Sequence, residues 1–505
     1  MASISETLYR SLVSVWRSLR SMRTALILLL VVAVASVFGS LVPQLGVARP
    51  AVVRLYLDHP LLARIYETLG LFDVYGSWWF TTCYALLLIS LASCLVPRTR
   101  AFRRGLGLRP QPMRELEGMR HFTETTIPVA PERALDRARG VLRRRRFRVA
   151  PVQPGLAAEK GRARESGSLL FHWSLFLVLV GAVYGKGFGF IGQATVVEGE
   201  TWTEAHASYD LPPDEGRFFA ESMHTGFGVR VEDFDATYHP SGLPRDFRSR
   251  VTLIDGGGRP AGQRVIRVNE PLKHEGVKLY QLGYGWAPVL EVRFDDRLLA
   301  AEPVVFTTRS PNDLAAPWRG VVKLPSLEPD VGLELRLFPD PVSGLAGGPM
   351  LEARDPFLFY DAWRGDLRLD RAQSVFALDK TGLQPFGQGG GFGLGETATL
   401  PNGVEITFAE LREYTQFLVK RDPGTGIMLA AALLTLLGLL PALYSSRRRV
   451  WVRVIPADGP GTRLQVAGFA MQRREAFEDE FRSIAGELSR REAAGEPAAG
   501  SERTG

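Results

Sequence analysis

The chain is poor in cysteine and lacks the short motifs that mark many enzymes and nucleotide-binding proteins. Two cysteines among 505 residues exclude a disulfide-stapled secreted scaffold and a multi-cysteine zinc or iron–sulfur protein. The sequence has no CxxC, HExxH, GxxxxGK(S/T) or GxSxG motif, and no GxGxxG that follows a strand and opens a helix. The usual signatures of metalloproteases, P-loop proteins, α/β-hydrolases and dinucleotide-binding enzymes are therefore missing.

Charged residues are also missing from four long apolar runs. A helix needs about 20 apolar residues to cross roughly 30 Å of hydrocarbon, and each run has nearly that length. We therefore predict a membrane protein with four transmembrane helices, at residues 24–42, 78–96, 168–187 and 426–445. A cleaved signal peptide is the alternative for the first run, because three arginines precede it and Ala33-Val34-Ala35 resembles a cleavage site. That site falls inside the run, which is longer than a usual signal core, so the helix is favoured.

Positive charge beside the predicted helices sets their orientation. The segment 97–167 holds 18 Lys and Arg against 7 Asp and Glu, whereas 188–425 holds 24 against 34. This asymmetry predicts that residues 1–23, 97–167 and 446–505 are cytoplasmic and that 43–77 and 188–425 are extracytoplasmic.

The arginine-rich stretch Arg143–Arg148 has nucleic-acid binding as an alternative interpretation. Directly before a membrane helix, a positive-inside flank explains it better, and attraction to anionic lipid headgroups adds to that explanation. We therefore predict contact with membrane lipid and no nucleic-acid partner.

The segment 188–425 is predicted to form a large β-rich domain. Five short stretches alternate apolar and polar residues with the period of a strand: Gly228–Phe234, Arg250–Ile254, Val289–Phe294, Leu333–Phe338 and Val404–Phe408. Turn-forming clusters separate such stretches at Asp255–Gly258, Phe386–Gly391 and Pro401–Gly403. Many short strands favour a sandwich- or barrel-like fold.

The cytoplasmic segments carry weaker signals. Before the third apolar run, a helix over Pro131–Leu142 and strands near Phe147–Ala150 and Gly155–Ala158 predict a small αβ unit. The C-terminal tail is expected to contain a strand at Val450–Val454 and a charged helix at Gln472–Leu488. Residues 493–505, rich in Gly, Ala and Glu, are predicted to be disordered.

Among seven histidines, His172 alone lies inside an apolar run. An ionisable residue in a membrane helix is costly and therefore suggests a function, and an imidazole can ligate a metal, haem iron included. The alternative is an interfacial histidine that snorkels or packs against another helix.

The helical period separates His172 from a face of small residues. At 100° per residue, Ser174, Gly181 and Gly185 share one face, and His172 with its neighbours Phe176 and Leu179 lies opposite. Small residues let helices approach closely. The first face is therefore expected to pack within the protein and to leave the His172 face for a ligand or partner, with the reverse assignment open.

The other histidines give no comparable signal. His206, His224, His239 and His274 have no ligand-like spacing, so no metal site is predicted from them. His59 lies in the short outer loop before Pro60 and is a candidate for facing a partner.

Cys83 and Cys94 are eleven residues apart in one predicted helix, which places them roughly 16 Å apart and excludes a disulfide between them. We interpret them as buried inert thiols. Trp78 and Trp79 fit an interfacial aromatic belt, with the lining of a haem groove as the alternative.

Several motifs resemble those of the ResB/CcsB family of system II cytochrome c maturation, and they span the chain from about residue 16 to 455. The first helix exits through Gly39–Gln44, the second ends in Ser93–Arg98, and the third begins Phe171-His172-Trp173. The outer segment holds Val268–Leu272 followed by Gly276 and Tyr280-Gln281, and Asp422–Gly424 precedes the last helix.

This resemblance implies a multi-pass protein of the bacterial inner membrane whose large domain lies on the periplasmic side. Such proteins act with a CcsA/ResC-type membrane partner to transport or hold haem and to present it to apocytochrome c for covalent attachment. His172 matches the family's transmembrane histidine and would be an axial ligand of haem b, held transiently and shared with the partner. The chain lacks the partner's tryptophan-rich segment, so it is expected to be a non-catalytic subunit of a haem lyase complex, and no catalytic residue is assigned.

A second hypothesis is a membrane-anchored binding, sensor or scaffold protein unrelated to haem. Topology alone supports this hypothesis. No kinase, phosphatase or DNA-binding module that would serve a sensor follows the last apolar run. The presence of haem in the complex with the partner separates the two hypotheses.

Overall fold

The computed structural model describes residues 13–14, 16–45, 48–239, 244–308, 315–346, 349–371, 373, 376–457 and 461–490. The segment 493–505, for which the sequence predicts disorder, lies outside these ranges, as do the first twelve residues of the predicted N-terminal segment. The chain divides into two compact units. The first unit combines residues 1–182 with 425–505, and the second unit is residues 183–424.

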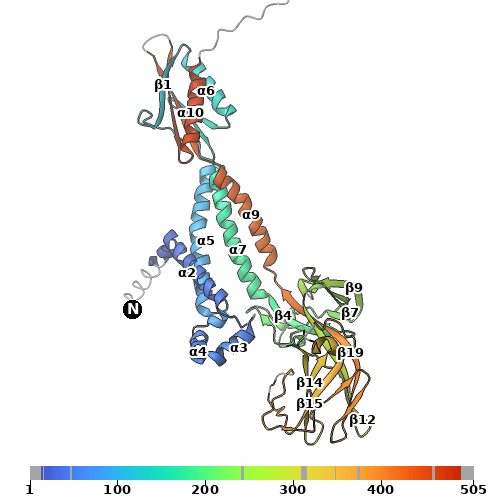
Figure 1. The fold of residues 1–505 in the computed structure, drawn as a ribbon. Coiled ribbons are helices and arrows are strands. Elements are labelled where there is room, and N and C mark those ends of the chain that lie inside the picture. Colours follow the sequence, from blue (N-terminus) through green and yellow to red (C-terminus); the bar gives the residue numbers. More distant parts are fainter. Residues whose placement is uncertain are drawn as a thin grey trace, which may run out of the picture. The chain divides into compact units, whose positions relative to one another are not determined.

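Four helices are long and apolar enough to cross a membrane, which agrees with the predicted apolar runs and indicates a membrane protein (Figure 1). They are α2 (Met22–Leu41), α5 (Trp78–Leu106), α7 (Ala163–Phe188) and α9 (Thr425–Tyr444). Helix α5 is longer than its apolar part, because it continues through Pro97 and ends in the arginine-rich segment. Arg162 donates hydrogen bonds of 3.1 Å to the carbonyls of Gly105 and Leu106, so the unpaired acceptors of this helix end are satisfied.

The side chain of Gln44 links the two ends of the segment between α2 and α5. It contains α3 (Arg49–Asp58), α4 (Pro60–Thr68) and the short helix η1 (Leu71–Asp73). Gln44 donates from Nε2 to the carbonyls of Val42 and Leu71 and accepts the Val74 N–H at Oε1. One side chain therefore fastens the exit of α2 to the entry of α5.

The predicted cytoplasmic segments, far apart in sequence, build one αβ domain. Its sheet has the order β1 (His121–Ile127), β21 (Thr462–Ala470), β20 (Arg448–Pro456), β3 (Gly155–Lys160) and β2 (Arg148–Val152), all antiparallel. The helices α6 (Pro131–Arg144) and α10 (Arg474–Ser489) share an apolar core with the sheet (Figure 1). The elements foreseen from sequence are thus present, and β20 and β21 complete a sheet begun before α7.

A buried carboxylate lies at the junction of these two segments. Glu159 in β3, whose side chain is 3% exposed, contacts Arg162 at 2.5 Å, Arg447 at 3.3 Å and Arg449 at 3.4 Å. Burial favours the protonated acid, but hydrogen bonds and charge from Arg162 and Arg447 outweigh it and lower the pKa of Glu159. The carboxylate is therefore ionised at neutral pH and joins the segment before α7 to the segment after α9.

The second unit consists of three antiparallel sheets, as the predicted β-rich domain requires. The central sheet has the order β10 (Leu272–His274), β11 (Val277–Phe294), β19 (Glu405–Arg421), β4 (Phe190–Val197) and β6 (Asp214–Glu215), with β12 (Arg297–Pro303) beside β11 and β18 (Thr397–Thr399) beside β19. Another sheet contains β13 (Trp318–Leu324), β14 (Val331–Phe338), β15 (Phe357–Arg364) and β16 (Gln384–Pro385), with β17 (Gly390–Gly393) beside β15; α8 (Pro341–Leu345) follows β14. The last sheet contains β5 (Thr201–Thr203), β7 (Gly228–Tyr238), β8 (Pro244–Ile254) and β9 (Pro260–Arg267).

Two long strands, β11 and β19, run through both apolar cores of this unit. Near one end, Leu279 and Phe417 pack with the sheet that contains β7. Near the other end, Leu290 and Phe408 pack with the sheet that contains β14. The described strands form open sheets and no closed barrel, so the barrel form of the prediction is not confirmed.

One predicted turn is shorter than expected. Residues 386–389 lie outside any strand, as the prediction of a turn over Phe386–Gly391 requires, but Gly390–Gly393 form β17 and pair with β15. A Cβ at Gly390 would lie 2.9 Å from the Tyr360 ring, and a Cβ at Gly391 would lie 2.4 Å from the Phe357 ring. Glycine is used here because aromatic side chains cover the strand, which the sequence alone does not reveal.

Glu413 in β19 carries a strongly shifted pKa in the second unit. Burial and the neighbouring carboxylates of Glu198, Asp233 and Asp235 raise its pKa to about 8. The folded chain therefore keeps a proton that the unfolded chain releases above the ordinary value of 4.5. Stability is then highest below that value and falls as the pH rises toward 8.

We expect the substitution Glu413→Gln to remove this pH dependence. Gln mimics the neutral acid, so the variant should be more stable than the wild type by ~2–5 kcal/mol above pH 8 and similar to it below about pH 4.5. Urea unfolding of the full-length protein in detergent at pH 5 and pH 9 measures the difference. The control is Glu405→Gln, a change at an exposed position of the same strand. If Glu413→Gln stabilised the protein equally at both pH values, the raised pKa of Glu413 would be contradicted.

Candidate functional site

The helix that carries His172 is packed tightly on one side by α9. Ser174 Oγ lies 2.8 Å from Thr435 Oγ1. A Cβ at Gly181 would lie 2.8 Å from Met428, and a Cβ at Gly438 would lie 2.6 Å from the backbone nitrogen of Phe171. The predicted packing role of the Ser174 and Gly181 face is therefore confirmed, because small residues on both helices permit close approach.

Polar contacts hold another side of α7 against α5. Trp173 Nε1 donates to Thr99 Oγ1 at 2.9 Å, and the Tyr84 hydroxyl donates to the Leu179 carbonyl at 3.0 Å. In an apolar surrounding such hydrogen bonds fix how a helix is rotated, because their loss leaves a buried polar group unpaired. α7 is thus held in a defined rotation, and the direction of His172 is defined with it.

His172 is half-buried and fixed in a single tautomer. Its Nδ1 lies 2.6 Å from the backbone carbonyl oxygen of Ser168, one helical turn earlier. A carbonyl oxygen can only accept, so Nδ1 carries the hydrogen and Nε2 of the neutral ring keeps a lone pair. Within the described part of the chain, Nε2 has no hydrogen-bond partner. The Phe171 ring meets the imidazole edge-on, with 5.4 Å between ring centroids.

This arrangement suits a metal ligand. Ligating histidines usually donate their other ring N–H to a carbonyl or carboxylate, which fixes the tautomer and raises the basicity of the ligating nitrogen. The Ser168 carbonyl does this for His172. The residues present therefore fit an axial ligand to haem iron, with Nε2 as the donor atom.

The other residues singled out in the sequence have ordinary contacts. Cys83 and Cys94 are free thiols, and Cys94 Sγ donates to the Arg20 carbonyl. Trp79 Nε1 donates to the Leu69 carbonyl, whereas Trp78 is 80% exposed. His59 forms the junction between α3 and α4.

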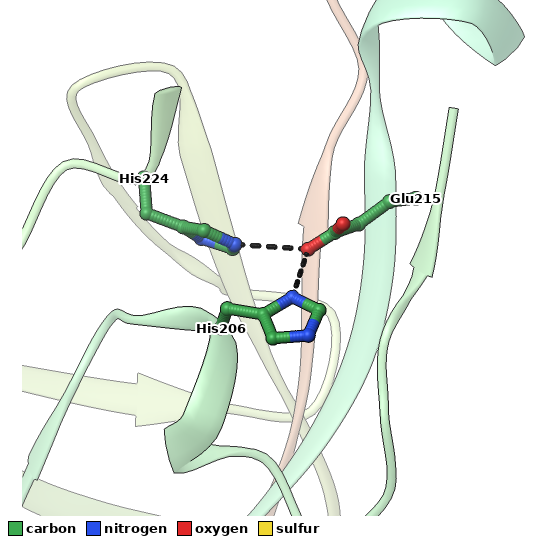
Figure 2. Close-up of side chains that lie close together, drawn as sticks. All are labelled: His206, Glu215 and His224. Carbon is green, nitrogen blue, oxygen red and sulfur yellow. Dashed lines mark hydrogen bonds and ion pairs between the residues drawn. The ribbon is translucent and has the colours of Figure 1, made fainter. Parts of the chain in front are cut away.

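The second unit contains a cluster that sequence reasoning missed. His206 in the short helix η2 (His206–Ser208), Glu215 in β6 and His224, directly after η3 (Glu221–Met223), point toward one another (Figure 2). Their ligand atoms all lie within 4.8 Å of one another. Successive members of the cluster are nine residues apart and belong to different short elements. This spacing matches no ligand motif, so no local signal was available for the cluster.

The charges in this cluster are coupled. Hydrogen bonding to the Glu215 carboxylate raises the pKa of His206. Burial acts to raise the pKa of Glu215, but hydrogen bonds from His206 and His224 outweigh it and lower that pKa. Glu215 is therefore a carboxylate at neutral pH.

Comparison with known proteins connects most of the chain to one family. The model described as the ResB-like family matches residues 22–482. The cytochrome c biogenesis protein CcsB of Thermosynechococcus vestitus is 29% identical over 494 residues, which cover 93% of this chain and 95% of that protein. The protein of the same name from Microcystis aeruginosa is 24% identical over 477 residues (92% and 93%), and that from Gloeobacter violaceus is 26% identical over 495 residues (94% and 92%).

Proposed function

The chain belongs to the ResB-like family, and we propose that it is a membrane subunit of cytochrome c biogenesis that holds or transports haem together with a CcsA-type partner. Haem is the cargo, and its vinyl groups become bonded to the cysteine thiols of apocytochrome c outside the cytoplasm. The chain itself supplies no catalytic residue in this proposal. It binds and positions haem b and presents it to the partner and the apocytochrome.

The geometry of His172 carries the proposal. A helix without Asp, Glu, Lys or Arg between Ser168 and Gly185 bears one imidazole, whose Nδ1–H is hydrogen-bonded to a carbonyl and whose Nε2 lone pair is available. A neutral imidazole is a replaceable axial ligand, as a carrier that must also release its cargo requires. The contacts of α7 with α5 and α9 preset the ring orientation, so little ordering accompanies ligation.

Charge supports the proposed orientation of the chain. The αβ domain of the first unit, built from segments rich in arginine, would face the cytoplasm and its anionic lipid surface. The second unit, with its excess of acidic residues, would lie on the periplasmic side of a multi-pass inner-membrane protein. It has no cysteine, so it would not compete by thiol–disulfide exchange for the thiols of an apocytochrome.

Reconstitution of the pathway tests the function. A bacterial strain deleted for its own cytochrome c maturation genes would express this chain, a CcsA-type partner and a reporter apocytochrome with one CxxCH site. We expect covalent haem on the reporter, detected by haem staining after denaturing electrophoresis. The same strain without this chain is the control, and equal staining in both would refute the proposed function.

A further inference from the structure

The cluster of His206, Glu215 and His224 in the second unit has the composition of a metal site and is separate from the proposed haem contact. His206 Nδ1 lies 2.7 Å from Glu215 Oε1, and His224 Nε2 lies 3.0 Å from the same oxygen. Figure 2 shows the carboxylate of Glu215 between the two imidazole rings. Two imidazoles and one carboxylate are a common ligand set for a divalent transition metal.

His224 has a carboxylate on both sides. Its Nδ1 is hydrogen-bonded to Oε1 of Glu204, and its Nε2 faces Glu215. A neutral imidazole has only one N–H. If Nδ1 donates to Glu204, the lone pair of Nε2 points at a carboxylate oxygen, which is repulsive unless a cation lies between them. A metal ion held by both atoms removes this repulsion.

Glu204 is the hydrogen-bond partner that orients His224. Glu204 is fully buried and accepts hydrogen bonds from the Tyr209 hydroxyl, the Thr225 N–H and the Thr225 hydroxyl in addition to His224. A buried carboxylate that fixes a histidine through Nδ1 is the usual support of a metal-ligating imidazole.

Aromatic rings complete the support of His224. The rings of Phe190 and Phe219 lie 5.1 and 5.0 Å from the imidazole by centroid, and the side chain of His224 is 5% exposed. Nε2 is therefore held in one direction, toward Glu215. His206 is 39% exposed, so the cluster is open to solvent on that side.

The spacing of the ligand atoms suits a small tetrahedral ion. With metal–ligand distances of about 2.0–2.2 Å, neighbouring ligand atoms of a tetrahedral zinc site lie about 3.4 Å apart. The observed distances to Glu215 Oε1 are 2.7 and 3.0 Å, and all three ligand atoms lie within 4.8 Å of one another. The two separations from Glu215 Oε1 therefore need to widen by only about 0.4–0.7 Å to admit the ion. We propose that His206, Glu215 and His224 bind one divalent transition-metal ion of the Zn²⁺ type, with an open coordination position on the His206 side.

Zinc titration of the full-length protein tests this site. The protein, purified in detergent without a histidine tag, would be stripped with a chelator and titrated with Zn²⁺ by calorimetry. We expect one tight equivalent in the wild type. His206→Ala and Glu215→Gln should each raise the Kd by at least ~100-fold through loss of a ligand, and Glu204→Gln by about 10–100-fold through loss of ring orientation.

A second readout separates metal binding from misfolding. Excess Zn²⁺ should raise the thermal unfolding temperature of the wild type but not of His206→Ala, because binding to the folded state alone stabilises it. His239→Ala, an exposed histidine after β7, should behave like the wild type. Wild-type protein without a stoichiometric equivalent, or a His206→Ala variant that binds Zn²⁺ as tightly as the wild type, would overturn the proposal and leave the three side chains joined by hydrogen bonds alone.

Discussion

Replacing His172 with glycine is expected to remove most of the haem that co-purifies with this chain and its CcsA-type partner. The lone pair of Nε2 belongs to the one imidazole that α7 carries between Ser168 and Gly185. Loss of an axial ligand should lower the Soret absorbance per complex by about an order of magnitude or shift the band. Residues that only support a metal ligand already contribute about 10–100-fold in affinity, so loss of the ligand itself should cost at least as much. The absorption spectra of the two purified complexes measure this effect.

Imidazole supplied in the growth medium distinguishes ligation from folding. Glycine leaves space for the free ligand beside Phe171, so added imidazole should restore the band in the His172→Gly complex. His121→Gln is the matched control, because His121 lies in β1 and packs on Phe477 and Phe481 outside the apolar helices. A mutant complex with wild-type haem content and an unchanged spectrum would assign His172 to helix packing.

The substitution Glu159→Ala is expected to destabilise the αβ domain of the first unit by about 3 kcal/mol. Removing one partner of a buried ion pair typically costs about 3–5 kcal/mol, because the remaining charge is left unpaired. Arg447 and Arg449 are 36% and 40% exposed and can regain water, so the lower end of that range applies. Arg162 is 23% exposed. It would lose its carboxylate partner but keep its hydrogen bonds to the carbonyls at the end of α5.

Native-state proteolysis of the full-length protein in detergent measures this change. Cleavage in the arginine-rich segments should accelerate by about 100-fold for a loss near 3 kcal/mol when opening is at equilibrium. Glu478→Ala, which removes an exposed pair with Arg482 in α10, should change the rate little. Equal cleavage of the wild type and Glu159→Ala would show that Glu159 does not join the two segments energetically.

The same carboxylate predicts a loss of stability in acid. The folded pKa of Glu159 is lowered, so its contribution is present above the ordinary carboxyl pKa and is lost as the pH falls through the lowered value. The Glu159→Ala variant should lack this part of the acid sensitivity. Glu413 acts in the opposite direction in the second unit, where stability falls as the pH rises.

The sequence by itself determined the parts of this protein that depend on local composition. Four runs without charge indicate membrane helices because a helix pairs its own backbone groups and needs only length and apolar side chains. Strands such as β14 followed from a period of two, and the face of α7 that packs on α9 followed from the spacing of Ser174 and Gly181. The position of His172 as the one histidine in an apolar run was visible in the same way.

The tertiary structure decided everything that depends on long-range strand pairing. β3 pairs with β20 across the whole second unit and two apolar helices, so Glu159 meets Arg447 and Arg449 only in the folded chain. Gly390 and Gly391, predicted as the end of a turn, are strand residues of β17, because aromatic rings from β15 cover them and leave room only for glycine. His206, Glu215 and His224 lie within one segment between β5 and β7. They meet because β6 pairs with β4 and holds Glu215 near the short helices η2 and η3. The spacing of the three residues in the sequence does not show that this segment folds back on itself.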